Sequence, residues 1–146
     1  MILIKSKFFV FKKMLGCLTK NGKKNKAYKI MCRVLILLKL EYPTQDPLLF
    51  LSSVFLKMVP LAEIKKKRIA GKLYQIPAPL TEARGFTIGL HYFMQSVLKR
   101  HERDISVRIV NELVDFLANK GNTFKVLSDM RELIRVNRTY VKYLKI

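Results

Sequence analysis

The chain has 146 residues, of which 29 are Lys or Arg and 10 are Asp or Glu, so its formal net charge is +19. Half of the residues are hydrophobic, which excludes a disordered basic tail and predicts one domain, residues 1–146, with a buried core. A charge excess of this size repels itself in a compact chain unless a polyanion neutralises it. The usual polyanions are DNA, RNA and anionic membrane surfaces.

The charge is distributed unevenly along the chain. Residues 1–40 carry eleven basic side chains and no acidic one, and every carboxylate lies from Glu41 onward. The two cysteines, Cys17 and Cys32, form neither a disulfide framework nor a CxxC metal pair. They are expected to be small buried residues of the first helices, in a reducing compartment.

Helical periodicity dominates the first third of the chain. A first helix is predicted over residues 5–18, with Phe8, Phe11, Leu15 and Leu18 on its apolar face. A Lys-Asn-Gly turn follows, and a second helix is predicted over residues 25–40. Asp46 is positioned to cap a third helix that starts at Pro47 and ends before Pro60.

The stretch from residue 63 to residue 79 has a different pattern. Strand-forming residues flank Ala70-Gly71, and two prolines close the segment. This pattern predicts a two-stranded β-hairpin with its turn near residues 70–72.

Three more helices are expected after the hairpin. One runs from a cap at Thr81-Glu82 to Arg100, one follows Asp104, and the last begins between Leu127 and Asp129. The predicted fold is therefore mainly α, with about six helices and a protruding two-stranded hairpin.

Basic residues form three groups in this scheme, and each group is a predicted phosphate-binding surface. The turn group consists of Lys20, Lys23, Lys24, Lys26 and Lys29; the hairpin group consists of Lys65, Lys66, Lys67, Arg68 and Lys72; the last-helix group consists of Arg131, Arg135, Arg138, Lys142 and Lys145. Helical spacing predicts that the last group shares one face without a carboxylate. Ordinary solvated surfaces remain the alternative for the turn group and the last-helix group. For Tyr74, stacking on a base and packing of the hairpin onto the helices are both open.

The sequence provides no set of catalytic or cofactor-binding residues. His91 and His101 are the only histidines, and no nucleotide-binding loop, nucleophile motif or metal-ligand spacing is present. Glu112 and Asp115 are interpreted as surface ion-pair partners of Arg108 and Lys120. Gly85 and Gly89 indicate close helix packing. No enzyme activity, cofactor or metal is expected, and no apolar stretch approaches the ~20 residues of a membrane-spanning helix.

Four motifs occur in order along the chain: NGKK at residues 21–24, KRIAGKLYQIP at 67–77, NELVD with NKG at 111–121 and VNRTYVKY at 136–143. Together they resemble the S-seven family of small-subunit ribosomal proteins. Residues 67–77 (KRIAGKLYQIP) resemble the family's hairpin, which has a basic pair, a small-Gly turn and Tyr-Gln-Val-Pro. Residues 111–115 (NELVD) with 119–121 (NKG), residues 136–143 (VNRTYVKY) and residues 21–24 (NGKK) are similar to the family's later helices and its first turn.

The resemblance implies a structural component of the small ribosomal subunit. Members bind the 3′ major (head) domain of the small-subunit rRNA, support head assembly, lie near the exit-site tRNA and mRNA, and touch neighbouring small-subunit proteins. The predicted rRNA-binding set comprises the three basic groups together with Tyr74, Gln75, Arg84, Arg100 and Arg103.

Some positions depart from the family pattern. Only residues 1–5 lie before or at the start of the first predicted helix, so the family's basic amino-terminal arm is expected to be nearly absent. Ala70 replaces the first of two turn glycines. Enrichment in Lys, Ile, Leu and Phe favours an A/T-rich organellar gene, and hence the small subunit of a mitochondrial ribosome in the matrix. Another organellar ribosome or a cytoplasmic one is the alternative. A basic helical protein that binds DNA or a membrane surface, without insertion, is the alternative function.

Overall fold

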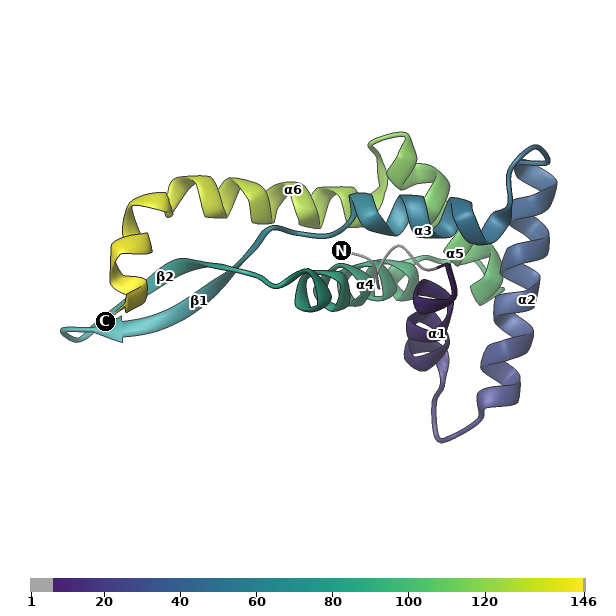
Figure 1. The fold of residues 1–146 in the computed structure, drawn as a ribbon, viewed down its shortest axis with the longest axis horizontal. Helices are drawn as coiled ribbons and strands as arrows, with labels where there is room; N and C mark the ends of the chain where they lie inside the picture. The colour runs from purple at the N-terminus through teal and green to yellow at the C-terminus, as the bar shows by residue number, and fades with distance from the viewer. Residues whose placement is uncertain (1–6, 146) are drawn as a thin grey trace.

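The computed structural model describes residues 7–145, with side chains for residues 8–143. A helical body carries a two-stranded ribbon that projects from one end (Figure 1). The elements in chain order are α1 (Lys7–Leu18), α2 (Lys24–Glu41), α3 (Pro47–Lys57), β1 (Ala62–Ile69), β2 (Lys72–Pro79), α4 (Glu82–Lys99), α5 (Ile105–Leu117), α6 (Gly121–Val136) and the 3₁₀ helix η1 (Arg138–Lys145). The predicted mainly helical fold with a β-hairpin is confirmed; residues 5 and 6 of the first predicted helix lie outside the described residues.

Buried side chains from α1 to α5, together with Leu127 of α6, form the core. Phe55 of α3 contacts Phe86 and Phe93 of α4, with ring centroids 6.1 and 5.1 Å apart, and all three rings are fully buried. The predicted inward positions of α4, namely Phe86, Leu90, Phe93 and Val97, are confirmed. This packing supplies a rigid platform from which the hairpin and α6 extend.

Aspartates cap two helix starts; the cap predicted at Asp46 is confirmed, whereas the Thr81 side chain predicted to cap α4 makes no capping hydrogen bond. The Asp46 side chain accepts a hydrogen bond from the Leu48 N–H (3.1 Å), and Pro47 occupies the first position of α3. At α5, the Asp104 side chain accepts from the Ser106 N–H (3.0 Å). Each cap satisfies a backbone donor that the first turn of a helix leaves without a partner.

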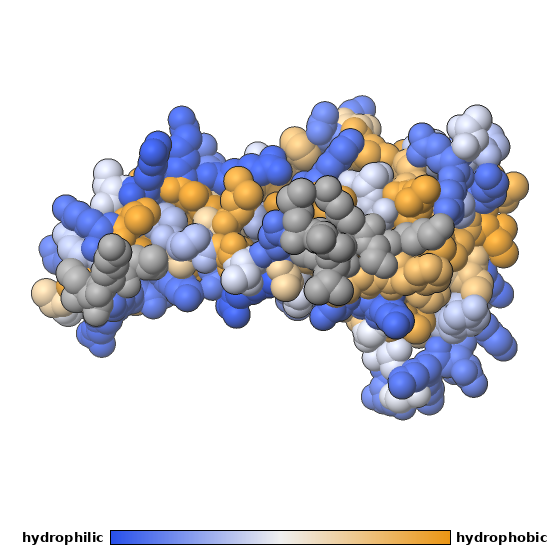
Figure 2. All heavy atoms as spheres, in the orientation of Figure 1, coloured by the Kyte–Doolittle hydropathy of each residue, from blue (hydrophilic) through white to orange (hydrophobic). Residues whose placement is uncertain are grey.

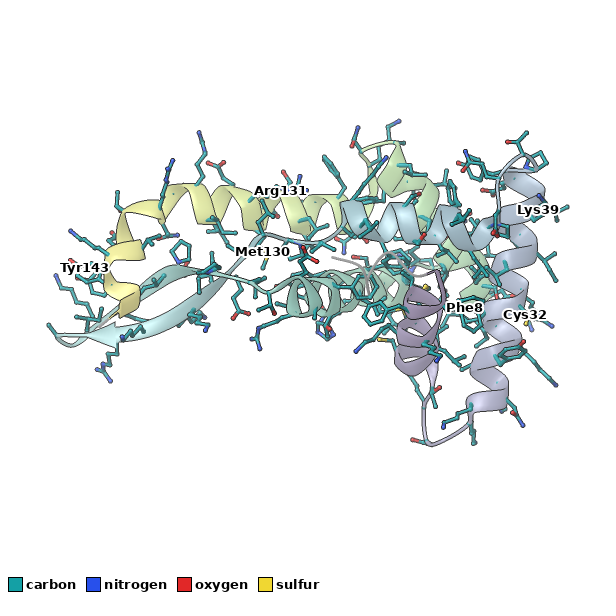
Figure 3. The ribbon with its side chains drawn as sticks, viewed as in Figure 1. Phe8, Cys32, Lys39, Met130, Arg131 and Tyr143 are labelled. Atoms are coloured by element: carbon teal, nitrogen blue, oxygen red, sulfur yellow. The ribbon has the colours of Figure 1, made fainter. Side chains whose placement is uncertain are left out.

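The apolar face predicted for α1 is wrong in part. Its buried residues are Val10, Met14 and Leu18, each one helical turn apart, so the prediction holds for Leu18, whereas Phe8 is 60% exposed (Figure 3). The prediction for the cysteines also fails, because Cys17 is exposed and Cys32 is half-buried. The face that packs on α3 is thus rotated from the one that the aromatic residues indicated.

The close packing predicted for the GxxxG of α4 is present, but its partner is the segment between α3 and the hairpin and not another helix. A Cβ on Gly89 would lie 2.7 Å from the Met58 carbonyl oxygen, and one on Gly85 would lie 2.8 Å from that of Pro60. Real side chains do not tolerate such distances, so glycine is needed for this approach. The contact fixes the base of the hairpin on the helical body.

The last helix differs most from its prediction. α6 begins at Gly121, at least six residues before the predicted start, because its first turn is capped by the buried carboxylate of Glu112. It ends at Val136, where the Asn137 side-chain amide donates to the Leu133 carbonyl (2.8 Å) and the chain continues as η1. A side-chain amide that competes for helix carbonyls is a common cause of such a break.

Candidate nucleic-acid interface

The hairpin is the element with the densest positive charge. β1 and β2 are antiparallel, with Ile69 opposite Lys72, so a two-residue turn of Ala70 and Gly71 joins them. Both turn residues have positive φ, +47° for Ala70 and +81° for Gly71, as a tight hairpin turn requires. Ala70 therefore adopts a conformation that costs an L-residue with a Cβ about 1–2 kcal/mol.

Alternation along the strands places basic residues on both faces of the ribbon. Lys65 and Lys67 share a face with Lys72, and Lys66 and Arg68 lie on the other. Lys65 lies 3.8 Å from Glu63, and Arg68 donates weakly to the Gly71 carbonyl (3.4 Å). Within the described residues, the other three have no ion-pair partner, so the ribbon offers charge in two directions.

Tyr74 packs the hairpin onto the carboxyl-terminal segment. Its ring lies 5.3 Å from that of Tyr140, nearly edge-on, and 5.6 Å from that of Tyr143. Tyr74 and Tyr140 are each half-buried. Of the two alternatives for Tyr74, this geometry favours packing, and the tyrosine cluster joins η1 to the ribbon.

The turn group lies at the opposite end of the molecule. Asn21 (φ +52°) and Gly22 (φ +72°) form the tight turn between α1 and α2, and the five lysines around it are exposed. None of these lysines has a carboxylate partner in the described part of the chain. The turn projects from the body and is strongly hydrophilic at its surface (Figure 2). The first turn of α2 also contains no acidic residue, so its free N–H groups add to the positive potential.

The prediction of one continuous basic face at the end of the chain is wrong. Arg131 and Arg135 lie on α6, whereas Arg138, Lys142 and Lys145 belong to η1, whose period is three residues instead of 3.6. A carboxylate is also present, because Arg135 donates to Glu132 through two nitrogens (2.7 and 3.0 Å). This contact lowers the pKa of Glu132. Lys142 lies 5.2 Å from the Tyr143 ring centroid, and the Lys145 side chain lies outside the described residues.

Three other predicted residues have distinct surroundings. Arg84 donates to Glu63 through two nitrogens (2.9 and 3.1 Å) on the exposed side of α4. Gln75 is half-buried and lines a groove beside the hairpin. Arg103 is exposed in the loop before α5 and has no ion-pair partner among the described residues.

Arg100 is held inside the protein by carboxylates. Its Nη1 donates to Glu112 (2.8 Å) and Asp115 (2.6 Å), its Nε donates to Glu102 (2.9 Å), and its side chain is only 21% exposed. Burial alone would lower the pKa of Arg100, but hydrogen bonds to Asp115, Glu112 and Glu102 raise it. Its Nε and Nη1 donors are thus bound to internal carboxylates.

Glu112 extends this cluster to α6. The Thr123 N–H and hydroxyl donate to its Oε1 (2.9 and 2.6 Å), and the side chain is 1% exposed. The interpretation of Glu112 and Asp115 as surface partners of Arg108 and Lys120 is therefore wrong. Sequence spacing gave no signal for this cluster, because Arg100 is twelve residues from Glu112 and its loop brings the two together.

No alternative site chemistry emerges from the described residues. Among them, no three His, Cys, Asp or Glu side chains gather as metal ligands. None of the described helices is long and apolar enough to cross a membrane. The geometry defines a basic, mainly helical protein whose cationic ribbon is fixed to the body by α6 and η1.

Comparison with known proteins gives the family. The family model described as "Ribosomal protein S7p/S5e" matches residues 3–138, and the chain belongs to this family. It is similar to "Small ribosomal subunit protein uS7c" of Cyanophora paradoxa, with 32% identity over 130 residues that cover 89% of this chain and 83% of the relative. It is also similar to "Small ribosomal subunit protein uS7" of Sulfurovum sp. (strain NBC37-1), with 30% identity over 138 residues (92% and 86%), and to that of Shewanella sediminis, with 28% identity over 131 residues (90% and 83%). The protein is a structural constituent of the small ribosomal subunit and not an enzyme.

Proposed function

We propose that this protein binds the 3′ major domain of the small-subunit rRNA, supports assembly of the subunit head and lies near the exit-site tRNA and the mRNA path. The hairpin carries the proposal. Its unpaired lysines point from both faces of a ribbon that extends beyond the helical body, and such an element fits between two segments of RNA backbone. Family membership supports the choice of rRNA over DNA or a membrane surface.

The proposed contacts are the turn group, the hairpin group and the basic residues of α6 and η1. The hairpin and η1 lie together at one end of the molecule and the turn group at the other (Figure 1), so folded RNA that surrounds the protein can engage them together. Arg103 and Gln75 remain proposed contacts, and Arg84 can still offer a guanidinium nitrogen that does not bind Glu63. Arg100 and Tyr74 are proposed to act indirectly, through the folded protein, since their neighbours in the structure are protein groups.

The proposed location is the small subunit of a mitochondrial ribosome. Composition supports an organellar gene, and the similar proteins include organellar-type uS7c as well as bacterial uS7. Neighbouring small-subunit proteins are proposed partners.

Replacement of Lys65, Lys66, Lys67 and Arg68 by Ala tests the hairpin. We expect weaker binding to a 3′ major domain rRNA fragment in filter-binding titrations over a range of salt. Each lost phosphate contact lowers the slope of log K against log salt by about 0.7–0.9. The quadruple variant is therefore expected to make this negative slope shallower by up to about 2.8–3.6.

A matched control removes the same charge elsewhere. Lys57, Lys99, Lys120 and Lys125 are exposed and lie outside the proposed contacts, so their replacement by Ala takes the net charge from +19 to +15 in the same way. The control is expected to retain most of the salt slope. Equal losses in the two variants would mean that net charge alone drives binding, and the hairpin assignment would fail.

A further inference from the structure

The surface beside the hairpin base contains a groove unlike the rest of this basic protein. It has a volume of about 770 Å³ and is lined by residues of the hairpin (β1 and β2), α4 and α6. Its apolar lining includes Ile64 of β1, Ile88 of α4, and Met130 and Leu133 of α6. Met130 lies on the side of α6 that faces the hairpin and α4 (Figure 3).

The apolar strip of α6 is incompletely covered in this groove. Only Thr123 and Leu127 of α6 are fully buried, and both lie in its first half. Further along, Met130 is half-buried and Leu133 is 47% exposed. Exposed apolar surface along a polar-rimmed groove is typical of an interaction site.

The charged side chains at the rim of this groove sum to zero, in contrast to the net charge of +19 of the chain. Lys66 and Arg84 are offset by Glu63 and Asp129. Glu63 is already bound by Arg84, but Asp129 has no ion pair or hydrogen bond among the described residues. Glu41 is the one other carboxylate among the described residues without an ion pair or hydrogen bond. An acidic group without a partner, in a chain with 29 cations, is available to a basic group from outside.

We infer that this groove binds a segment of a neighbouring small-subunit protein, one with aliphatic anchor residues and a Lys or Arg that pairs with Asp129. The aliphatic floor fits apolar side chains, and the Asp129 carboxylate attracts a cation and repels phosphate. RNA is therefore the less suitable occupant of the aliphatic floor beside Asp129, although Lys66, Gln75 and Arg84 of the rim are proposed rRNA contacts. The inference rests on the proposed function, because it places the protein among other small-subunit proteins.

A photo-crosslinking amino acid at Thr87 tests this inference in assembled small subunits. Thr87 is exposed on α4 and lines the groove. We expect a crosslink to one protein of the subunit, at a peptide that mass spectrometry shows to contain aliphatic residues and a Lys or Arg. Asp129→Lys should reduce the crosslink at least about tenfold, because it opposes like charges. Leu133→Asp should reduce it similarly.

Matched controls separate the groove from general effects. Glu41→Lys makes the same charge change at the other unpartnered carboxylate, and Leu49→Asp changes a leucine on α3 that is 54% exposed. Both controls should keep the crosslink. A crosslink to rRNA, no crosslink, or equal losses in groove and control variants would overturn the inference.

Binding of the same full-length variants to the rRNA fragment identifies which proposal has failed. If the unmodified chain does not bind rRNA, the proposed function is wrong. If it binds rRNA and enters subunits while the Thr87 probe reaches only RNA, the docking inference alone is wrong.

Discussion

Replacement of Arg100 tests whether this residue stabilises the fold or binds RNA phosphate. Replacement of Arg100 by Ala leaves Glu112 buried without its cationic partner, and Glu112 also holds the first turn of α6 through Thr123. Loss of one partner of a buried ion pair costs about 3–5 kcal/mol. Asp115 is 39% exposed and Glu102 is 30% exposed, so solvent compensates them in part. We therefore expect the free energy of unfolding to fall by about 3 kcal/mol, the lower end of that range.

Urea unfolding followed by circular dichroism measures this loss. The urea concentration at the midpoint should fall, while the dependence of the unfolding free energy on urea concentration stays unchanged. Arg103→Ala is the control, because Arg103 is exposed in the same loop; its effect should stay within about 0.5 kcal/mol. Glu112→Gln in the Arg100→Ala background should recover part of the stability by removing the buried negative charge, a non-additivity that a double-mutant cycle measures.

The opposite pattern would refute this reasoning. At a temperature and protein concentration at which the variant is folded, its affinity for rRNA should match that of the unmodified chain. If Arg100→Ala leaves stability unchanged and weakens rRNA binding with a smaller salt slope, Arg100 is a phosphate ligand and the sequence-based assignment is correct.

Three other changes have definite expected outcomes. Ala70→Gly should slow amide hydrogen exchange in the hairpin several-fold, because it removes the cost of about 1 kcal/mol of holding an alanine at positive φ. Faster exchange would contradict the assigned turn. Gly89→Ala should lower the free energy of unfolding by about 1–3 kcal/mol, since its Cβ would meet the Met58 carbonyl, whereas Gly16→Ala, with no atom within 4 Å, should not lower it. A hydrogen bond from its own backbone N–H, followed by those from Asn111 and Arg100, lowers the pKa of Glu102 to about 2, so its contribution should be present above the unfolded pKa and lost as pH falls from about 4.5 to about 2. Glu102→Gln should weaken the pH dependence of the unfolding free energy over that range. An unaltered pH profile would contradict the lowered pKa of Glu102.

Local signals in the sequence predicted most of the fold. Asp46-Pro47 and Asp104 identified two helix starts, because capping depends on side chains next to the helix. Strand-forming residues around Ala70-Gly71 located the hairpin, because its turn and its pairing are both short-range.

The error at the start of α6 arose because distant residues determine the structure there, whereas the error at its end has a local cause. The start of α6 depends on Glu112, which belongs to another helix and is held by Arg100 from a third segment. The end of α6 was missed because a basic helical periodicity continues past Asn137 even though the backbone changes to a 3₁₀ helix.

The basic groups of the candidate interface could be predicted from the sequence, but their arrangement in space could not. The groups of lysines were evident in the sequence, since unpaired cations need no partner to be recognised. The internal role of Arg100 and the contact of Tyr74 with Tyr140 and Tyr143 required the tertiary structure. The groove around Asp129 likewise combines residues from β1, β2, α4 and α6 that no local pattern connects.

The tyrosine cluster has a consequence for the order of events during synthesis. Tyr74 leaves the ribosomal exit tunnel well before Tyr140 and Tyr143, so the ribbon is made before the residues that brace it. An unbraced two-stranded ribbon is marginal in water. A nascent chain therefore presents its cationic hairpin in a loosely ordered form, and the hairpin reaches its final rigidity only after η1 has been translated and has packed against β2.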